Sequence, residues 1–249
     1  MLKSCVIIPC RFASTRFEGK PLALLNNNYL MTYPYKAATK ADSISDVFIA
    51  TDDDRISSIC KKLGMKFIMT DPNHLCGTDR VAEAFYKLDK KFDNVINVQG
   101  DEPFISPLEI DQCNNFLKSN NNYFAVNGVA PIFKMEDLLN TGVVKVVINS
   151  YKKILYFSRT PLPHPFIKKD NIIYYRQLGL YGFKSEALNV FKNNKPGSLE
   201  KSESVEMLRL LEQNFDLFAF ITSINGPAVD TESDLNIATQ ILNDNNANL

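Results

Sequence analysis

Short apolar runs alternate with amphipathic stretches along most of the chain. Runs rich in Val, Ile, Phe and Tyr predict strands at Cys5–Cys10, Asp46–Asp52, Lys66–Thr70, Asn94–Asp101, Tyr123–Pro131, Val143–Asn149, Ile154–Arg159, Gln177–Phe183 and Phe215–Ser223. Apolar residues at helical spacing predict helices at Met31–Ala41, Asp54–Leu63, Thr78–Lys91, Pro107–Ser119, Ser185–Asn193, Ser198–Gln213 and Thr231–Asn243. The first half thus alternates strand and helix, which favours a mainly parallel sheet covered on both faces.

Strands dominate after about Asn120, which favours an antiparallel insertion or an extension of the sheet over another alternating unit. No Gly/Ser-rich or Pro-rich linker divides the chain, and no internal repeat is evident. The 249 residues are enough to bury a substantial core. We therefore expect residues 1–249 to form a single α/β domain of the three-layer, Rossmann-like type, with a strand-rich part at about 121–185.

Charge and composition exclude several classes of function. The 28 Lys and Arg balance the 28 Asp and Glu, so no net charge attracts nucleic acid or an anionic membrane, and an anionic ligand needs a local group of cations. The apolar stretches are shorter than the roughly 20 residues of a membrane-spanning helix. The five Cys have no metal-site or disulfide spacing, and no signal peptide is visible at Met1. We expect a reduced, cytoplasmic protein.

Polar residues gather where the first four predicted strands end. In a parallel sheet these ends share one edge, where ligands bind. Arg11, Arg16 and Lys20 follow the first strand within ten residues, and Gly19 between them allows close approach of the backbone. Three cations suit a triphosphate or pyrophosphate. A solvated basic loop would have the same composition, and the segment is neither a Walker A loop nor a dinucleotide fingerprint.

Two carboxylates stand out in the same context. Asp101 follows the apolar run Val95–Val98, and a carboxylate at the end of a buried strand is costly unless it is paired or binds a metal. Oxygen ligands beside phosphates favour Mg²⁺. Asp230 precedes the last predicted helix, where either Asp230 or Thr231 could serve as the N-cap. An ordinary strand-end turn would explain Asp101, and a helix cap would explain Asp230. A role in metal binding requires that the two acids meet at one ion.

The segment after the third strand contains His74, Cys76 and Arg80. Only two His are present in the chain, so a zinc site is not expected. Cys76 has no evident base as a partner, which favours a packed thiol over a nucleophile. A cation in the first turn of a helix is unfavourable to the helix dipole. Arg80 is therefore expected either to face a ligand or to form an ion pair.

Taken together and in order, these motifs resemble the cytidylyltransferases that activate 3-deoxy-manno-octulosonate (Kdo), the CMP-Kdo synthetases. The similarity runs from Val6 to about Leu235. The matching segments are I-I-P-C-R-F-A-S-T-R-F-E-G-K-P-L, A-T-D-D-D-R-I, H-L-C-G-T-D-R-V-A-E, N-V-Q-G-D-E-P-F-I, V-V-K-V-V, L-Y-F-S-R-T-P-L-P, L-G-L-Y-G-F, L-E-K-S-E-S-V-E-M-L-R and V-D-T-E-S-D-L.

The resemblance implies a nucleotide-diphosphosugar-transferase-like fold, a homodimer, CTP as substrate and Mg²⁺ as cofactor. Carried over by motif, the residues that it places at the CTP phosphates and cytidine are Arg11, Arg16, Lys20, Cys76, Gly77, Thr78, Arg80 and Gln99. It makes Asp101 and Asp230 the metal ligands, with Lys20 counted among the catalytic residues. The residues that it places around the sugar acid are Arg159, Gln177, Tyr181, Glu203 and Glu206.

The implied reaction is in-line attack of the anomeric hydroxyl of Kdo on the α-phosphorus of CTP, with release of pyrophosphate and without a covalent enzyme intermediate. Two departures from the family pattern fall in segments assigned to the sugar: Gln177 replaces His, and Met207 replaces Gln. Loss of an amide that bonds a hydroxyl shifts substrate preference. We therefore also consider a Kdo relative such as the 8-amino form.

The sequence alone leaves four questions open. An enzyme for another ulosonic acid, such as a sialic acid, is disfavoured by the R-x-x-x-x-R-x-x-G-K spacing and by F-S-R. A regulator without catalysis is disfavoured because both Asp101 and Asp230 are present. The product could serve lipopolysaccharide or capsule synthesis. Leu138 and Leu139 could be core or interface residues.

Overall fold

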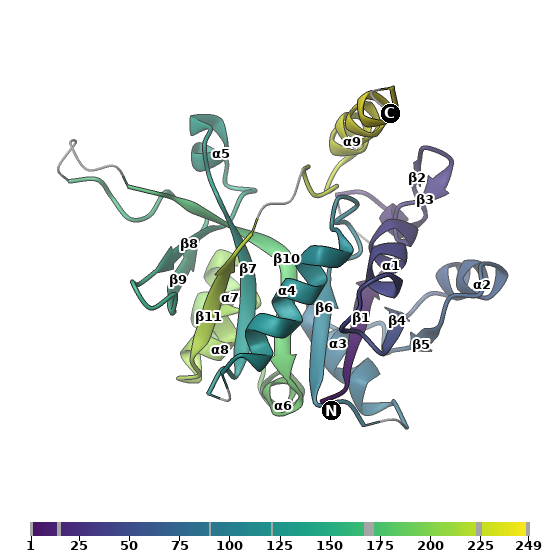
Figure 1. Ribbon diagram of the computed structural model, residues 1–249, viewed down its shortest axis with the longest axis horizontal. Coiled ribbons are helices and arrows are strands. Elements are labelled where there is room, and N and C mark those ends of the chain that lie inside the picture. The colour runs from purple at the N-terminus through teal and green to yellow at the C-terminus, as the bar shows by residue number, and fades with distance from the viewer. Residues whose placement is uncertain are drawn as a thin grey trace.

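The computed structural model describes residues 2–13, 16–89, 91–120, 122–166, 172–222 and 226–247, with backbone only for the last three (Figure 1). Lys90 and Ser223, which the predicted elements include, lie outside this described part. The described strands form a nine-stranded sheet and a small two-stranded hairpin. Helices lie on both faces of the large sheet (Figure 1). This arrangement confirms the expected α/β class.

The first half of the chain builds the parallel part of the sheet. Its strands are β1 (Ser4–Cys10), β4 (Asp46–Thr51), β5 (Phe67–Met69) and β6 (Asn94–Val98). Its helices are α1 (Thr32–Thr39), α2 (Asp54–Lys62), α3 (Gly77–Tyr86) and α4 (Pro107–Lys118). In β1, Cys5 and Ile7 pack on the face covered by α3, and Val6 and Ile8 pack on the face covered by α1 and α4. Burial on both faces explains why this strand is a continuous apolar run.

The strand-rich part extends the same sheet. It comprises β7 (Ala125–Pro131), β8 (Lys145–Ile148), β9 (Ile154–Ser158) and β10 (Tyr175–Lys184), followed later by β11 (Leu217–Ile221). Strand β10 runs antiparallel to β6, β7 and β8, whereas β11 is parallel to β7. The main path through the sheet runs β11-β7-β10-β6-β1-β4-β5. Of the two expected arrangements, an extension of the sheet is therefore the one observed.

Several elements differ from the prediction. The stretch 198–213 forms two short helices, α7 (Ser198–Glu203) and α8 (Leu208–Glu212), because Ser204 has a left-handed backbone with φ 52° that ends the first one. The stretch 185–193 is a 3₁₀ turn, Ser185–Ala187, followed by α6 (Leu188–Asn193). A hairpin of β2 (Leu24–Leu25) and β3 (Asn28–Tyr29), and helix α5 (Met135–Leu139), have no counterpart among the predicted elements.

The last helix, α9 (Glu232–Ala247), lies beside the β2–β3 hairpin (Figure 1). Leu25, Leu30, Val229 and Ala238 are buried together there, separately from the two clusters that cover the sheet. This small core fixes the segment before α9 against the N-terminal half of the molecule.

Burial separates two neighbouring leucines whose role the sequence left open. Leu138 is a core residue, whereas Leu139 is exposed. Among the described residues, no helix is long and apolar enough to cross a membrane.

Candidate active site

The loop after β1 delivers Lys20 to the carboxyl edge of the sheet. Gly19 has φ 67°, and a Cβ at this position would lie 3.0 Å from the Phe12 ring, so glycine is the residue that fits. The amide of Gly19 donates to the Phe12 carbonyl at 2.9 Å, and a 3₁₀ turn starts at Lys20. The position of the Lys20 backbone is thus fixed, while its side chain keeps four rotatable bonds.

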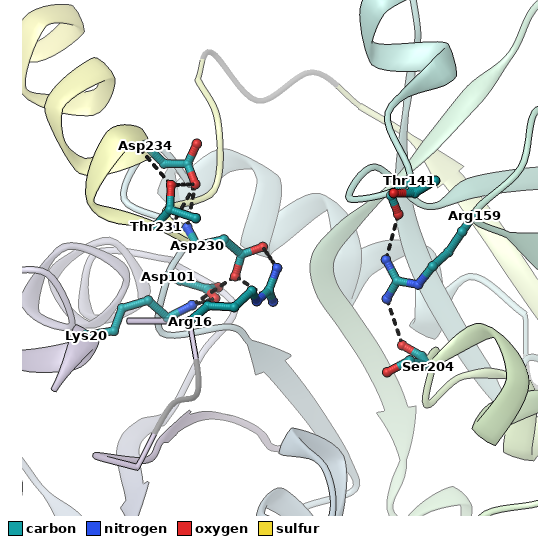
Figure 2. Close-up of polar contacts among 9 residues, drawn as sticks. All are labelled: Arg16, Lys20, Asp101, Thr141, Arg159, Ser204, Asp230, Thr231 and Asp234. Atoms are coloured by element: carbon teal, nitrogen blue, oxygen red, sulfur yellow. Dashed lines mark hydrogen bonds and ion pairs between the residues drawn. The ribbon is translucent and has the colours of Figure 1, made fainter. Parts of the chain in front are cut away.

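Lys20 brings together the two acids singled out in the sequence (Figure 2). Its Nζ lies 2.5 Å from Oδ2 of Asp101 and 3.1 Å from Oδ1 of Asp230. Both oxygens of Asp230 also accept hydrogen bonds from the Arg16 guanidinium, at 3.1 and 3.2 Å. Side chains that are more than 200 positions apart, Lys20 and Asp230, therefore converge on one point.

Asp230 is not the cap of α9. Thr231 takes that role: its Oγ1 accepts from the Asp234 amide at 3.2 Å, and Oδ2 of Asp234 accepts from the Thr231 amide at 2.9 Å (Figure 2). The Val229 amide donates to the Asp101 carbonyl at 2.9 Å, which joins the two acid-bearing segments. The capping explanation for Asp230 is therefore wrong, and its carboxylate faces Lys20 and Arg16 instead.

The segment from Cys76 to Arg80 begins α3 at the same edge. Cys76 is the N-cap, since its Sγ accepts from the Asp79 amide at 3.4 Å. Burial and neighbouring Glu206 raise the pKa of the Cys76 thiol well above its usual value, so it remains a thiol, as expected of a packed side chain. A Cβ on Gly77 would lie 3.1 Å from the Gln99 side chain, so the helix start is in close contact with the end of β6.

Glu206 links this helix start to the second half of the chain. Its carboxylate accepts from the Thr78 amide at 3.0 Å and from Gln99 Nε2 at 3.5 Å. Burial raises the pKa of Glu206, and the hydrogen bond from Thr78 opposes that shift. Three residues that the resemblance divides between cytidine and sugar are thus direct neighbours.

Arg80 forms an ion pair within the protein. It is 2% exposed, and its guanidinium lies 3.3 Å from Oδ2 of Asp52 and 2.5 Å from Oγ1 of Thr70. Of the two expectations for a cation at this position, the structure supports the ion pair. Arg11 behaves differently: it is exposed, and within the described part of the chain no hydrogen bond or ion pair engages it.

Arg159 lies apart from the cluster of Arg16, Lys20, Asp101 and Asp230, which we call the Lys20 group (Figure 2). Its Nε donates to the Glu203 carbonyl at 2.5 Å, Nη1 to the Thr141 carbonyl at 2.8 Å and Nη2 to the Ser204 carbonyl at 3.0 Å. A guanidinium has five N–H groups, so two of them have no acceptor among the described residues and remain for another partner. The carboxylate of Glu203 accepts from the Arg159 amide at 2.9 Å.

A buried lysine supports the Arg159 loop. Lys145 is fully buried, and its Nζ donates to the carbonyls of Asn140, Val143 and Arg159 at 2.7, 2.8 and 2.7 Å. Burial lowers the pKa of this ammonium, and the three carbonyls compensate for the lost hydration. Arg159 is therefore held through its backbone as well as through its side chain.

Gln177 and Tyr181 both belong to β10. Gln177 donates to Oδ1 of Asn127 at 2.9 Å, and the amide group of Asn127 in turn donates to the carbonyls of Leu178 and Leu180. Tyr181 is 6% exposed, and burial raises the pKa of its phenol well above its usual value. Gln177 therefore belongs to a hydrogen-bonded network on β7 and β10.

One acid at this edge was missed in the sequence. Glu102 is buried, and it accepts a hydrogen bond from the Gly179 amide at 2.9 Å. Burial, together with the charge of Asp101, raises the pKa of Glu102 to about 7. Glu102 directly follows Asp101 at the end of the same buried strand. The argument that a carboxylate there is costly unless it is paired therefore applied to both acids.

Met207 was wrongly assigned to the sugar side. It directly precedes α8 and is fully buried in the apolar core on the α3 face of the sheet. Its thioether therefore fills core space, and the departure from the family pattern at this position changes packing. Of the two replacements, Gln177 and Met207, it is Gln177 that makes a polar contact, its hydrogen bond to Asn127.

A buried arginine that the sequence did not single out holds this region together. Arg209 is 1% exposed, bonds Glu200 through two nitrogens at 2.7 Å and lies 2.6 Å from Oδ1 of Asp79. Burial alone would lower the pKa of Arg209, but hydrogen bonds to Glu200 and Asp79 outweigh it and raise the pKa. The same arginine lines a cavity of about 520 Å³ between α3 and α6, to which Lys20, Asp101 and Asp230 do not contribute.

The Lys20 group contains carboxylate oxygens that could serve as ligands for a hard divalent ion. Two carboxylates from different segments share one cationic group, and carboxylate oxygen is a ligand that Mg²⁺ prefers. Within the described ranges, no group of three or more His, Cys, Asp or Glu side chains could hold a metal ion. Asp101 and Asp230 thus fit a metal whose remaining ligands are water or substrate oxygens.

Comparison with known proteins connects this geometry to a family. The family model described as cytidylyltransferase matches residues 5–219. The 3-deoxy-manno-octulosonate cytidylyltransferase of Thermodesulfovibrio yellowstonii is 40% identical over 98% of this chain and 99% of its own length. That of Cytophaga hutchinsonii is 39% identical over 92% of this chain and 93% of its own length.

Solved structures agree with the sequence matches. A CMP:2-keto-3-deoxy-manno-octonic acid synthetase complexed with CTP superimposes with a TM-score of 0.91 at 30% identity, covering 98% of this chain and 99% of that one. A putative glucose-1-phosphate thymidylyltransferase from Bacillus anthracis, with a TM-score of 0.69 at 14% identity and coverage of 96% and 94%, shares the fold. This chain belongs to the 3-deoxy-manno-octulosonate cytidylyltransferase, or CMP-Kdo synthetase, family of nucleotidyltransferases.

Proposed function

We propose that the protein transfers CMP from CTP to the anomeric hydroxyl of Kdo and releases pyrophosphate, with Mg²⁺ as cofactor and with a cytoplasmic location. The observation that carries the proposal is the convergence of Lys20, Asp101 and Asp230 at the sheet edge where α3 begins. The relatives named for this activity are 40% and 39% identical, and a solved relative is complexed with CTP.

In the proposed reaction the chain positions three anionic groups: the sugar carboxylate, the α-phosphate and the departing pyrophosphate. Arg11, Arg16 and Lys20 would bind phosphate oxygens, since they are the cations of the loop after β1. When bound by Asp101 and Asp230, Mg²⁺ would neutralise phosphate charge and lower the pKa of the attacking hydroxyl. The two N–H groups of Arg159 that have no acceptor in the described part of the chain suit the sugar carboxylate.

The residues around the start of α3 would select the cytosine base of CTP. Gln99 and the backbone of the Cys76–Thr78 segment meet there, close to Glu206. Arg80 would act indirectly in this proposal, by holding Thr70 and Asp52 beside the helix start. The hydroxyl oxygen gives up its proton to solvent and forms the new bond to the α-phosphorus. The bond from the α-phosphorus to the bridging oxygen breaks, and pyrophosphate leaves with that electron pair, so no protein nucleophile is required.

Pyrophosphate release from CTP with Mg²⁺ and a panel of ulosonic acids tests this function. We expect turnover with Kdo or its 8-amino relative, and little with a sialic acid. Gln177 differs from the family pattern, so kcat/KM for the two Kdo forms decides between them: a large preference for plain Kdo would remove the 8-amino alternative. If CTP binds but no acid supports its cleavage, the protein is a nucleotide-binding regulator instead.

We further propose a homodimer formed through the strand-rich part. Phe133, Met135 and Leu139, on and beside α5, are 91%, 66% and 62% exposed, and Met135 and Leu139 are one helical turn apart. Sedimentation equilibrium is expected to give twice the 28.2 kDa of one chain. The double substitution Met135→Glu, Leu139→Glu should yield monomers, whereas Leu63→Glu, at the exposed position directly after α2, should not. A wild-type protein that sediments as a monomer at micromolar concentration refutes this assembly.

A further inference from the structure

We propose that Lys20 occupies the metal position while no nucleotide is bound, so that the divalent ion can enter only when Lys20 has moved away. This inference rests on the proposed function, because it takes Asp101 and Asp230 as the ligands of the ion. It assigns Lys20 a second role, distinct from binding phosphate: it makes binding of the metal depend on binding of CTP.

The contacts of Lys20 support this role. Its Nζ lies 2.5 Å from Asp101 and 3.1 Å from Asp230, so the ammonium sits between the two carboxylates (Figure 2). The Lys20 side chain is 15% exposed and that of Asp101 is 22% exposed, so solvent screens the pair only partly. Asp230 has Arg16 as a second cationic partner, whereas Lys20 is the cation in ion-pair contact with Asp101 within the described part of the chain.

An ammonium and a divalent ion cannot use these oxygens together. Mg²⁺ binds oxygen at 2.0–2.1 Å, in a near-ideal octahedron, and it needs the lone pairs to which Lys20 now donates. Two cations held by the same pair of carboxylates would also repel each other strongly in a partly buried site. Metal binding to the free protein therefore requires that the Lys20–Asp101 contact is broken, which weakens the affinity for the metal.

CTP supplies the means of moving Lys20. The backbone at Lys20 is fixed by the turn at Gly19, but the flexible side chain can swing from the carboxylates to a phosphate oxygen. The phosphates then replace the lost carboxylate partners of Lys20, and their oxygens add ligands for the metal. By thermodynamic linkage, CTP must raise the affinity for the metal by the same factor as the metal raises the affinity for CTP.

Binding of Mn²⁺ to the nucleotide-free protein, measured by electron paramagnetic resonance, tests the inference. Lys20→Met and Lys20→Gln both remove the ammonium, and each is expected to bind Mn²⁺ at least about 10-fold more tightly than the wild type. The matched control is Lys36→Met on α1, since Lys36 contacts the Asn28 amide rather than a carboxylate. Its Mn²⁺ affinity should equal that of the wild type.

Two further measurements locate the effect. The double variant Lys20→Met, Asp101→Asn should lose the gain in affinity, because the ion then lacks one of its two carboxylates. Mn²⁺ should raise the melting temperature of Lys20→Met by more than it raises that of the wild type, since the ion replaces the missing counter-charge. Lys20 variants that fold but bind Mn²⁺ no more tightly than the wild type overturn the inference.

This result is separable from the proposed function. If the Lys20 variants gain Mn²⁺ affinity while the wild type cleaves CTP with no ulosonic acid, the reaction is wrongly assigned and the role of Lys20 stands. If CMP transfer is observed and the variants gain nothing, the role of Lys20 fails and the reaction stands.

Discussion

Asp101→Asn is expected to lower the rate of CMP transfer by about 100-fold or more, with the fold intact. The substitution keeps the shape of the side chain and an oxygen that can accept from Lys20, but it removes the charge that would bind the metal. An effect of this size follows the loss of one group that stabilises charge in a transition state. Single-turnover measurement of pyrophosphate release with saturating CTP reports the loss directly.

The matched control for this variant is Asp216→Asn, which removes a carboxylate from an exposed pair with Lys153 on the surface. It should leave the rate unchanged, and both proteins should melt near the wild-type temperature. A folded Asp101→Asn protein that turns over at the wild-type rate would exclude Asp101 from the metal site, and with it the proposed mechanism.

Arg209→Met is expected to lower the free energy of unfolding by about 3–5 kcal/mol. Arg209 is 1% exposed, and its loss leaves the buried Glu200 and the partly buried Asp79 without their shared cation. Met fills similar space, so the lost packing is small compared with the cost of the unpaired acids. Chemical denaturation at pH 7 measures the change.

A partial rescue distinguishes unpaired charge from lost packing as the cause. Adding Glu200→Gln to Arg209→Met removes one of the two unpaired charges and should restore part of the stability. Lys153→Met, at the exposed pair with Asp216, should change stability by no more than about 1 kcal/mol. If the double variant is less stable than Arg209→Met alone, repulsion and desolvation of the acids are not the cause.

The parallel half of the fold could be predicted from sequence because its signals are local. Every position of β1 from Cys5 to Ile8 is apolar, as a strand covered on both faces requires. The predicted convergence of the strand-end segments followed from topology alone, and the contact of Lys20 with Asp101 confirms it. The contact of Lys20 with Asp230 could not be derived in this way, because Asp230 precedes α9 and does not follow one of the first four predicted strands.

The parts that sequence could not predict depend on tertiary contacts. The break between α7 and α8 lies at Ser204, whose left-handed backbone has no local signature, and the helical periodicity continues across it. The position of Met207 in the core depends on that break, because an uninterrupted helix would orient the residue differently. Arg209 was overlooked because its partner Asp79 is 130 positions away in the chain.

The order of the chain has a consequence for biosynthesis. Asp230 comes after every strand of the described sheet, and it is positioned by the segment that leads into α9. A nascent polypeptide can therefore assemble its sheet, with Lys20 beside Asp101, before the second acid has left the ribosome. Catalytic competence would then appear only after residue 230 has emerged, so that a chain released before this point would be folded and still inert.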